Sequence, residues 1–122
     1  MMKSLLIVAH GSRREDSNNE VRLLADTIQK TVSEQAELVK AAFLELAEPS
    51  IPDGIQQCID AGATEVLVYP YFLTRGRHVV TDIPNEVAIK VKEHPHVNIL
   101  ILPHLGAMTG IPELILKQSA QG

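Results

Sequence analysis

Apolar residues gather in four short runs along the chain, and each run is bounded by polar residues. A continuous apolar run of this length is typical of a strand that is buried on both faces of a parallel sheet. The runs therefore predict four strands, at residues 5–9, 38–44, 66–69 and 97–102. Between the strands, apolar residues recur at spacings of three and four, which predicts helices.

Start and stop signals place the first two helices. Ser17 and Glu20 have the spacing of a capping box, so the first helix is expected from about residue 18 to 33. The second is expected to begin after Ser50 as its N-cap, with a proline in the first turn. Gly62 is expected to end it.

The third helix is expected to begin at Asp82 and Pro84. It should end at His94, because the residue before a proline is driven out of helical geometry. A short last helix is predicted to begin at residues 109–112. The predicted buried face of the third helix consists of Ile83, Val87, Ala88 and Val91.

Strands that alternate with helices predict an α/β fold, here a flavodoxin-like, doubly wound sheet of four parallel strands with helices on both faces. The order 2-1-3-4 with right-handed crossovers is the simplest arrangement. At 122 residues, the chain is expected to form one domain, residues 1–122. In such sheets, ligands bind beyond the carboxyl ends of the strands, at the point where the strand order reverses.

Composition indicates the compartment and the partners to expect for this chain. The apolar fraction of 45% and the charged fraction of 21% are those of an ordinary globular protein. A lone Cys58 cannot form an internal disulfide, and no apolar run reaches membrane-spanning length. We therefore expect a cytoplasmic protein with no membrane partner. The formal charge of −4 argues against nucleic acid as a partner, since that interaction depends on clustered basic residues.

Three residues of types that bind metals are expected at the carboxyl edge of the sheet. His10 directly follows the first strand and Glu45 follows the second. His78 lies in the connection 69–84, which is long for a compact chain and too apolar to be disordered. Because the three strands are neighbours in the order 2-1-3-4, two imidazoles and a carboxylate should converge, and this donor set suits a divalent transition metal.

Each donor also has an ordinary structural explanation. His10 could bond the start of the first helix, Glu45 could be a solvated carboxylate, and His78 could be an exposed loop residue. Their coincidence at one edge favours the metal site over these separate explanations. Of the other histidines, two fall at the opposite edge of the sheet, and His104 follows the fourth strand as an outside candidate.

The arginines indicate an anionic ligand near the same edge. Four of the five lie in two short segments that follow the first and third strands, namely Arg13, Arg14, Arg75 and Arg77. The guanidinium fork suits carboxylate or phosphate, although solvated surface charge is an alternative. The sequence contains no Gly-x-Gly-x-x-Gly, no phosphate-binding Gly-Lys-Ser/Thr loop and no Cys-x-x-Cys, so no nucleotide is expected.

Four segments of the chain closely resemble the CbiX and SirB sirohydrochlorin chelatases. They are residues 8–13 (VAHGSR), 42–51 (AFLELAEPSI), 70–79 (PYFLTRGRHV) and 82–84 (DIP). The resemblance covers nearly the whole chain in the right order. It implies ATP-independent insertion of a divalent metal, cobalt or iron with nickel possible, into sirohydrochlorin. This planar tetrapyrrole carries peripheral carboxylates and leads to cobalamin or siroheme.

The resemblance also implies roles for individual residues. The implied metal ligands, which are also the implied catalytic residues, are His10, Glu45 and His78. The implied substrate-binding residues are Ser12, Arg13, Arg75, Gly76 and Arg77. Many family members carry two such units in one chain and short members are known as homodimers, so a homodimer is expected. Residues 103–106 depart from the family pattern through their histidine.

Two other functions remain open at this point. A non-catalytic metal-binding or metal-delivery module on the same fold would bind metal tightly without affinity for the macrocycle. A flavodoxin-like anion-binding domain would instead use the arginines for phosphate at the start of the first helix. In that second case His10 and His78 would be dispensable.

Overall fold

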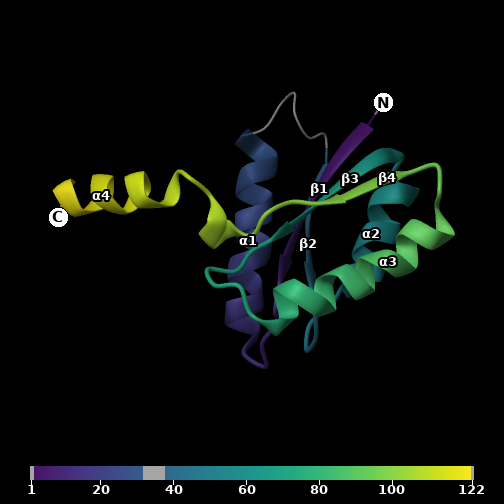
Figure 1. The fold of residues 1–122 in the computed structure, drawn as a ribbon, viewed down its shortest axis with the longest axis horizontal. Helices are drawn as coiled ribbons and strands as arrows, with labels where there is room; N and C mark the ends of the chain where they lie inside the picture. The colour runs from purple at the N-terminus through teal and green to yellow at the C-terminus, as the bar shows by residue number, and fades with distance from the viewer. Residues whose placement is uncertain (1, 32–37, 122) are drawn as a thin grey trace.

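The computed structural model describes residues 2–31 and 38–121, apart from the side chains of His78 and Gln121. Its strands form one parallel sheet in the order β2-β1-β3-β4, as the sequence predicted (Figure 1). The chain leaves β1 toward β2 on one side and later returns to β3 on the other. The strand order therefore reverses between β1 and β3. The strands are β1 (Met2–Ala9), β2 (Leu38–Phe43), β3 (Ala63–Pro70) and β4 (Asn98–Ile101).

The central strands β1 and β3 begin earlier than their apolar runs. Met2 pairs with Ala63, and Lys3 pairs with Glu65. The Lys3 ammonium also lies 3.5 Å from the Glu65 carboxylate. Pairing of this kind requires only backbone groups, so the strands extend past the stretch whose side chains are buried on both faces.

Helix α1 (Glu15–Thr31) begins at Glu15 rather than near residue 18. Ser17 consequently lies inside the helix, and the predicted capping box is wrong. Glu15 and Asp16 place negative charge in the first turn, where the helix dipole favours it. The predicted end of this helix, at residue 33, lies outside the described residues.

Helix α2 (Ile51–Asp60) confirms its predicted signals. The Ser50 hydroxyl accepts a hydrogen bond from the Asp53 backbone N–H at 3.2 Å, which makes Ser50 the N-cap. Gly62 follows the helix with a φ of 109°, a conformation in which glycine has no steric penalty. Local sequence therefore fixes both ends of α2.

Helix α3 (Ile83–Glu93) is preceded by a π-helical turn, η1 (His78–Asp82). Asp82 makes no capping side-chain bond, because its backbone is already helical at φ −69° and ψ −43°. The predicted buried face of α3 is half wrong. Ile83 and Val87 are buried as expected, whereas Ala88 and Val91 are exposed.

The two faces of the sheet carry separate apolar cores. Helices α2 and α3 cover one face, and α1 covers the opposite face (Figure 1). On the first face, the fully buried sheet residues include Leu6, Val8, Val66 and Val68. On the second, Ala25 of α1 packs with Ile7 and Val39. The predicted arrangement with helices on both faces is confirmed.

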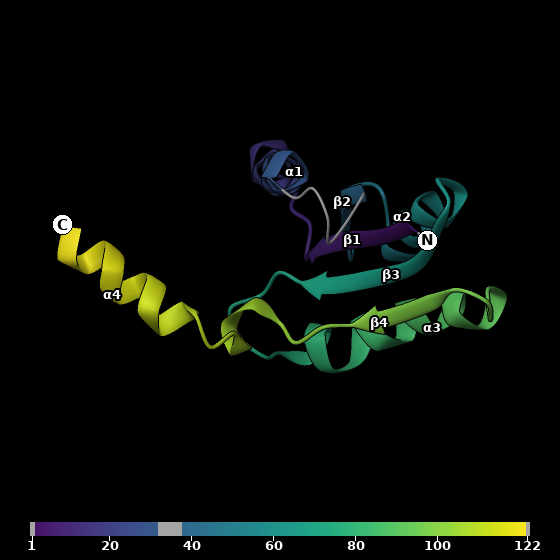
Figure 2. The ribbon, with the colours of Figure 1, turned by 90° about the horizontal axis from the view of Figure 1, so that it is seen from above.

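After β4 the chain makes a short 3-10 turn, η2 (Leu105–Ala107), and then forms α4 (Ile111–Gln121). Helix α4 extends away from the α/β body in both views (Figures 1 and 2), and its main contact is with η2. The helix begins where the sequence predicted. No helix in the described ranges combines the length and apolar composition that crossing a membrane requires.

Candidate metal centre

The structure brings His10 and Glu45 together at the carboxyl edge of the sheet. His10 follows β1 and Glu45 lies two residues beyond β2. The Nε2 atom of His10 lies 3.0 Å from Oε2 of Glu45, and about half of each side chain is exposed. This confirms that the two strand ends converge. An imidazole and a carboxylate in contact, and open to solvent, are two donors that a divalent metal could take.

The backbone holds the same two residues in register. The Glu45 N–H donates to the His10 carbonyl at 3.0 Å, and the Leu44 N–H donates to the Ala9 carbonyl at the same distance. Backbone hydrogen bonds between the two segments therefore continue past the last residues of β1 and β2. The side-chain contact between His10 and Glu45 follows from this extension.

Gly11 makes the close approach of these two segments possible. Its φ is +96°, in the left-handed region that side-chain-bearing residues rarely adopt. A Cβ atom at this position would overlap the carbonyl oxygen of Glu45. The glycine between His10 and Ser12 is therefore required by both conformation and space.

His78, the third predicted donor, begins η1 in the connection that follows β3. Its side chain lies outside what the structure describes. Among the described residues, no group of three or more His, Cys, Asp and Glu side chains is placed to hold a metal ion. A three-donor centre of His10, Glu45 and His78 thus stays a prediction.

The predicted substrate-binding residues lie around this edge. Arg13, Arg75 and Arg77 are all exposed, on the segments that follow β1 and β3. A Cβ added to Gly76 would meet open space, so nothing in the described chain requires glycine there. The hydroxyl of Ser12 accepts a hydrogen bond from the Arg14 backbone N–H at 3.0 Å.

Two pockets flank the strand ends. One, of about 400 Å³, lies between Glu45 and the start of α3, with Asp82 and Glu86 in its lining. The other, of about 350 Å³, lies between the segments that follow β3 and β4, and Arg75 and His104 line it. One pocket is thus acidic and borders a predicted metal ligand. The other combines apolar walls with cationic or polar groups, and it contains the histidine that the sequence left as an outside candidate.

Asn18 is a polar residue near the site that sequence reasoning missed. It is 1% exposed, and its side chain bonds both backbone groups of Ser12. A signal was available, because Asn18 shares a helical stripe with Val21 and Ala25, which face the core. A polar residue at an apolar position of such a stripe needs hydrogen-bond partners inside the protein.

Several titratable groups outside the His10 and Glu45 pair have pKa values that burial or hydrogen bonds shift. Burial raises the pKa of the Cys58 thiol, which makes it a poor nucleophile or metal ligand. Burial likewise raises the pKa of Tyr69. The Arg22 guanidinium, through its hydrogen bond, lowers the pKa of Glu15. Metal chemistry in the described chain is therefore best supported at the His10 and Glu45 pair.

Comparison with known proteins identifies relatives of this chain. The model of the CbiX family matches residues 4–121. The chloroplastic sirohydrochlorin ferrochelatase of Arabidopsis thaliana is 42% identical over 104 residues, which cover 84% of this chain and 44% of that protein. The sirohydrochlorin cobaltochelatase of Methanococcus maripaludis is 40% identical over 88 residues, which cover 72% of this chain and 60% of that protein.

The fold has a close match among solved structures. The sirohydrochlorin chelatase SirB from Bacillus subtilis subspecies spizizenii, solved in complex with cobalt, superposes with a TM-score of 0.85 at 29% identity. The match covers 99% of this chain and 51% of that chain. The chain thus spans about half the length of the curated relatives it matches.

Proposed function

The chain belongs to the CbiX family, and from this premise we propose that it inserts a divalent metal ion into sirohydrochlorin without ATP. The contact between His10 and Glu45 at 3.0 Å carries the proposal, because it places two metal donors at the carboxyl edge of the sheet, on β1 and its neighbour β2, beside the point where the strand order reverses. The relatives named as sirohydrochlorin ferrochelatase and cobaltochelatase support the same reaction.

In the proposed mechanism, His10, Glu45 and His78 hold the metal and are the catalytic residues. The metal takes the place of the hydrogen bond between His10 and Glu45, since a coordinating nitrogen cannot also donate a proton to the carboxylate. As pyrrole nitrogens replace the protein ligands stepwise, two N–H protons leave the macrocycle. A histidine released from the metal, or Glu45, accepts them.

The substrate side of the proposal rests on charge. Sirohydrochlorin carries peripheral carboxylates, and Arg13, Arg75 and Arg77 present exposed guanidinium groups around the strand ends. Ser12 and Gly76 complete the proposed binding surface, Gly76 because its open surroundings leave room for a flat ligand beside the backbone. The metal substrate is cobalt or iron, with nickel possible, and the product serves cobalamin or siroheme synthesis.

The proposal also covers the domain organisation, oligomeric state and compartment of the protein. We propose that residues 1–122 form a single chelatase domain and act as a homodimer in the cytoplasm. Exposed apolar side chains on α4 support an association of copies. The lone cysteine, which is buried, fits a reducing compartment.

The test measures metal insertion into sirohydrochlorin by absorbance, with Co²⁺, Fe²⁺ and Ni²⁺ in turn and no ATP. His10→Ala, Glu45→Gln and His78→Ala should each lower turnover by more than about 100-fold, since losing a ligand exceeds the usual cost of changing its surroundings. The control is His96→Ala, an exposed histidine at the opposite edge, which should retain wild-type turnover.

Two outcomes contradict the proposal. Near-normal turnover in the His10→Ala or His78→Ala variant removes the assigned roles. Tight Co²⁺ binding without any change in the macrocycle spectrum identifies a metal-delivery module instead.

A further inference from the structure

We propose that Asn18 and Arg22 act as positioning residues that fix the separation of His10 and Glu45. Together we name these two residues the α1 brace. The inference rests on the proposed function, because it assigns the brace to the metal site of that reaction. Each of the two residues holds a segment that carries one of the proposed metal ligands.

Asn18 holds the segment that contains His10. Its Oδ1 accepts from the Ser12 N–H at 2.9 Å, and its Nδ2 donates to the Ser12 carbonyl at 2.8 Å. Both backbone groups of one residue are therefore bonded to one nearly inaccessible side chain. Ser12 is two residues from His10, and the constrained Gly11 lies between them. Asn18 therefore fixes the backbone position of Ser12, and through Gly11 it restricts the position of His10.

Arg22 holds the segment that contains Glu45. Its Nη2 donates to the Glu48 carbonyl at 2.9 Å, and its guanidinium lies 5.1 Å from the centre of the Phe43 ring. Phe43 is fully buried and precedes Glu45 by two residues, whereas Glu48 follows it by three. One side chain of α1 thus contacts the chain on both sides of Glu45.

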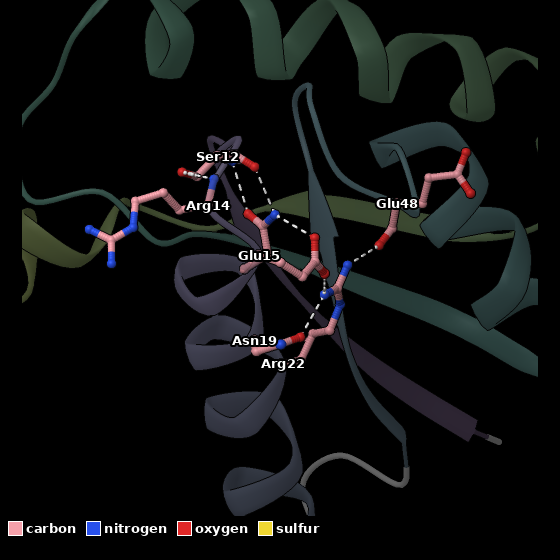
Figure 3. Close-up of polar contacts among 7 residues, drawn as sticks. Ser12, Arg14, Glu15, Asn19, Arg22 and Glu48 are labelled. Atoms are coloured by element: carbon pink, nitrogen blue, oxygen red, sulfur yellow. Dashed lines mark hydrogen bonds and ion pairs between the residues drawn. The ribbon is translucent and has the colours of Figure 1, made fainter.

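Glu15 joins the two members of the brace. Its carboxylate accepts from Asn18 at 3.3 Å and also from Arg22, and Arg22 additionally donates to Asn19 at 2.8 Å (Figure 3). The hydrogen bond from Arg22 lowers the pKa of Glu15, because it favours the ionised carboxylate. Figure 3 shows the Arg22 guanidinium directed at Glu15, Asn19 and the Glu48 backbone.

This orientation distinguishes Arg22 from the arginines proposed to bind substrate. Its Nη1 and Nη2 atoms donate to groups of its own chain, and its side chain is about one third exposed. The first turns of α1 therefore connect the segment after β1 to the segment after β2. Replacing groups that orient metal ligands typically costs about 10–100-fold in metal affinity or activity.

The experiment compares Arg22→Ala, Arg22→Lys and Asn18→Asp with wild-type protein. It measures the Kd for Co²⁺ in the absence of macrocycle, the absorption spectrum of bound Co²⁺, kcat and KM for sirohydrochlorin, and the thermal midpoint. Asn18→Asp keeps the acceptor but replaces the amide donor by an oxygen that repels the Ser12 carbonyl. Lys30→Ala is the matched control, because it removes a long exposed cation from the far end of the same helix.

We expect Asn18→Asp and Arg22→Ala to weaken Co²⁺ binding by about 10–100-fold and to change the Co²⁺ spectrum, which reports ligand geometry. Arg22→Lys should be intermediate, because a lysine cannot bond Glu15, Asn19 and Glu48 in one plane. Lys30→Ala should match wild type. KM should change less than kcat, since the brace is proposed to act on the metal ligands and its hydrogen bonds go to groups of its own chain.

Variants with a lowered thermal midpoint but wild-type Kd and Co²⁺ spectrum overturn the inference, because the brace would then serve stability alone. If Asn18→Asp does not fold, the same comparison of Kd, Co²⁺ spectrum and thermal midpoint is made with Arg22→Ala, which changes a partly exposed residue. His10→Ala and Glu45→Gln, measured in parallel, separate the two proposals. If they keep Co²⁺ binding, the proposed function fails; if they lose it and Arg22→Ala does not, only the brace fails.

Discussion

Gly11 allows the contact between His10 and Glu45 because it has no side chain. The two segments that carry His10 and Glu45 approach so closely that the Glu45 carbonyl occupies the place of a Cβ at position 11. The left-handed backbone of Gly11 also turns the chain from β1 toward α1. Position 11 therefore couples the direction of the turn to the contact between the two donors.

Replacing Gly11 tests this coupling. Gly11→Ala should destabilise the protein by about 1–3 kcal/mol for the backbone conformation alone, with a further cost from the overlap with Glu45. It should also weaken Co²⁺ binding, since Glu45 must move to relieve the overlap. Urea unfolding and a Co²⁺ titration measure the two effects.

Gly76→Ala provides the matched comparison for Gly11→Ala. The added methyl group meets open space, so the free energy of unfolding should stay within about 0.5 kcal/mol of wild type. Equal stability loss in both variants would contradict the account of Gly11. A loss of turnover in Gly76→Ala without a loss of stability would agree with the proposed role beside the macrocycle.

The contrast between His10 and Asn18 shows what sequence can reveal about single residues. His10 and Glu45 could be paired from sequence because strand ends in a parallel sheet meet at one edge, so order and position suffice. The role of Asn18 depends on its side chain turning back to Ser12, six residues earlier. The nearby Ser17 and Glu20 offered a plausible cap. The helical stripe that Asn18 shares with Val21 and Ala25 indicates a need for buried partners, but local spacing does not identify Ser12 as that partner.

At the level of elements, β4 explains the error in the predicted face of α3. β4 has four residues and lies at the edge of the sheet, and its apolar side chains line an open pocket beside α3 without closing over Ala88 and Val91. Ile83 and Val87 reach the core, whereas Ala88 and Val91 border an apolar pocket of about 410 Å³. Periodicity predicts which residues could be buried together, but it does not show how wide the surface beneath them is.

Paired substitutions on α3 test this assignment. Val87→Ala removes methyl groups from a side chain that is 3% exposed, and it should lower the free energy of unfolding by about 1–3 kcal/mol. Val91→Ala removes the same atoms from a side chain that is 46% exposed, and it should cost less than about 0.5 kcal/mol. Denaturant melts of dilute protein measure both, and equal costs would restore the face predicted from sequence.

Element order and type were predictable because they depend on patterns spread over many residues. The strand order, the cap at Ser50 and the start of α4 were all confirmed. The boundaries of β1, β3 and α1 were not predicted accurately. The two strands are extended by backbone pairing, which leaves no mark in the side-chain pattern. Helix α1 begins at Glu15, before the predicted cap at Ser17. The π-helical turn η1 also falls within a stretch that the sequence marked only as a long connection.

On the scale of the whole molecule, α4 is the element without a core of its own. Its apolar side chains Leu114, Ile115 and Leu116 are 55%, 60% and 69% exposed. An isolated helix of eleven residues is only marginally stable in water, so a stable α4 requires packing. The proposed homodimer supplies that packing, because a second copy brings both another α4 and another edge at β4.

Lysine substitutions on α4 test the homodimer. Ile111, Leu114 and Ile115 share one stripe of the helix, so Leu114→Lys and Ile115→Lys should each convert the dimer to a monomer, measured by light scattering at several concentrations. Glu113→Lys places the same side chain on the opposite face and should leave the dimer intact.

The thermal midpoint of wild type should rise with concentration and that of the two stripe variants should not, since only dimerisation links stability to concentration. The α/β body should remain folded in all three variants, because α4 contacts mainly η2 within the described chain. A wild-type protein that is monomeric at every concentration, or stripe variants that remain dimeric, would show that α4 does not form the interface.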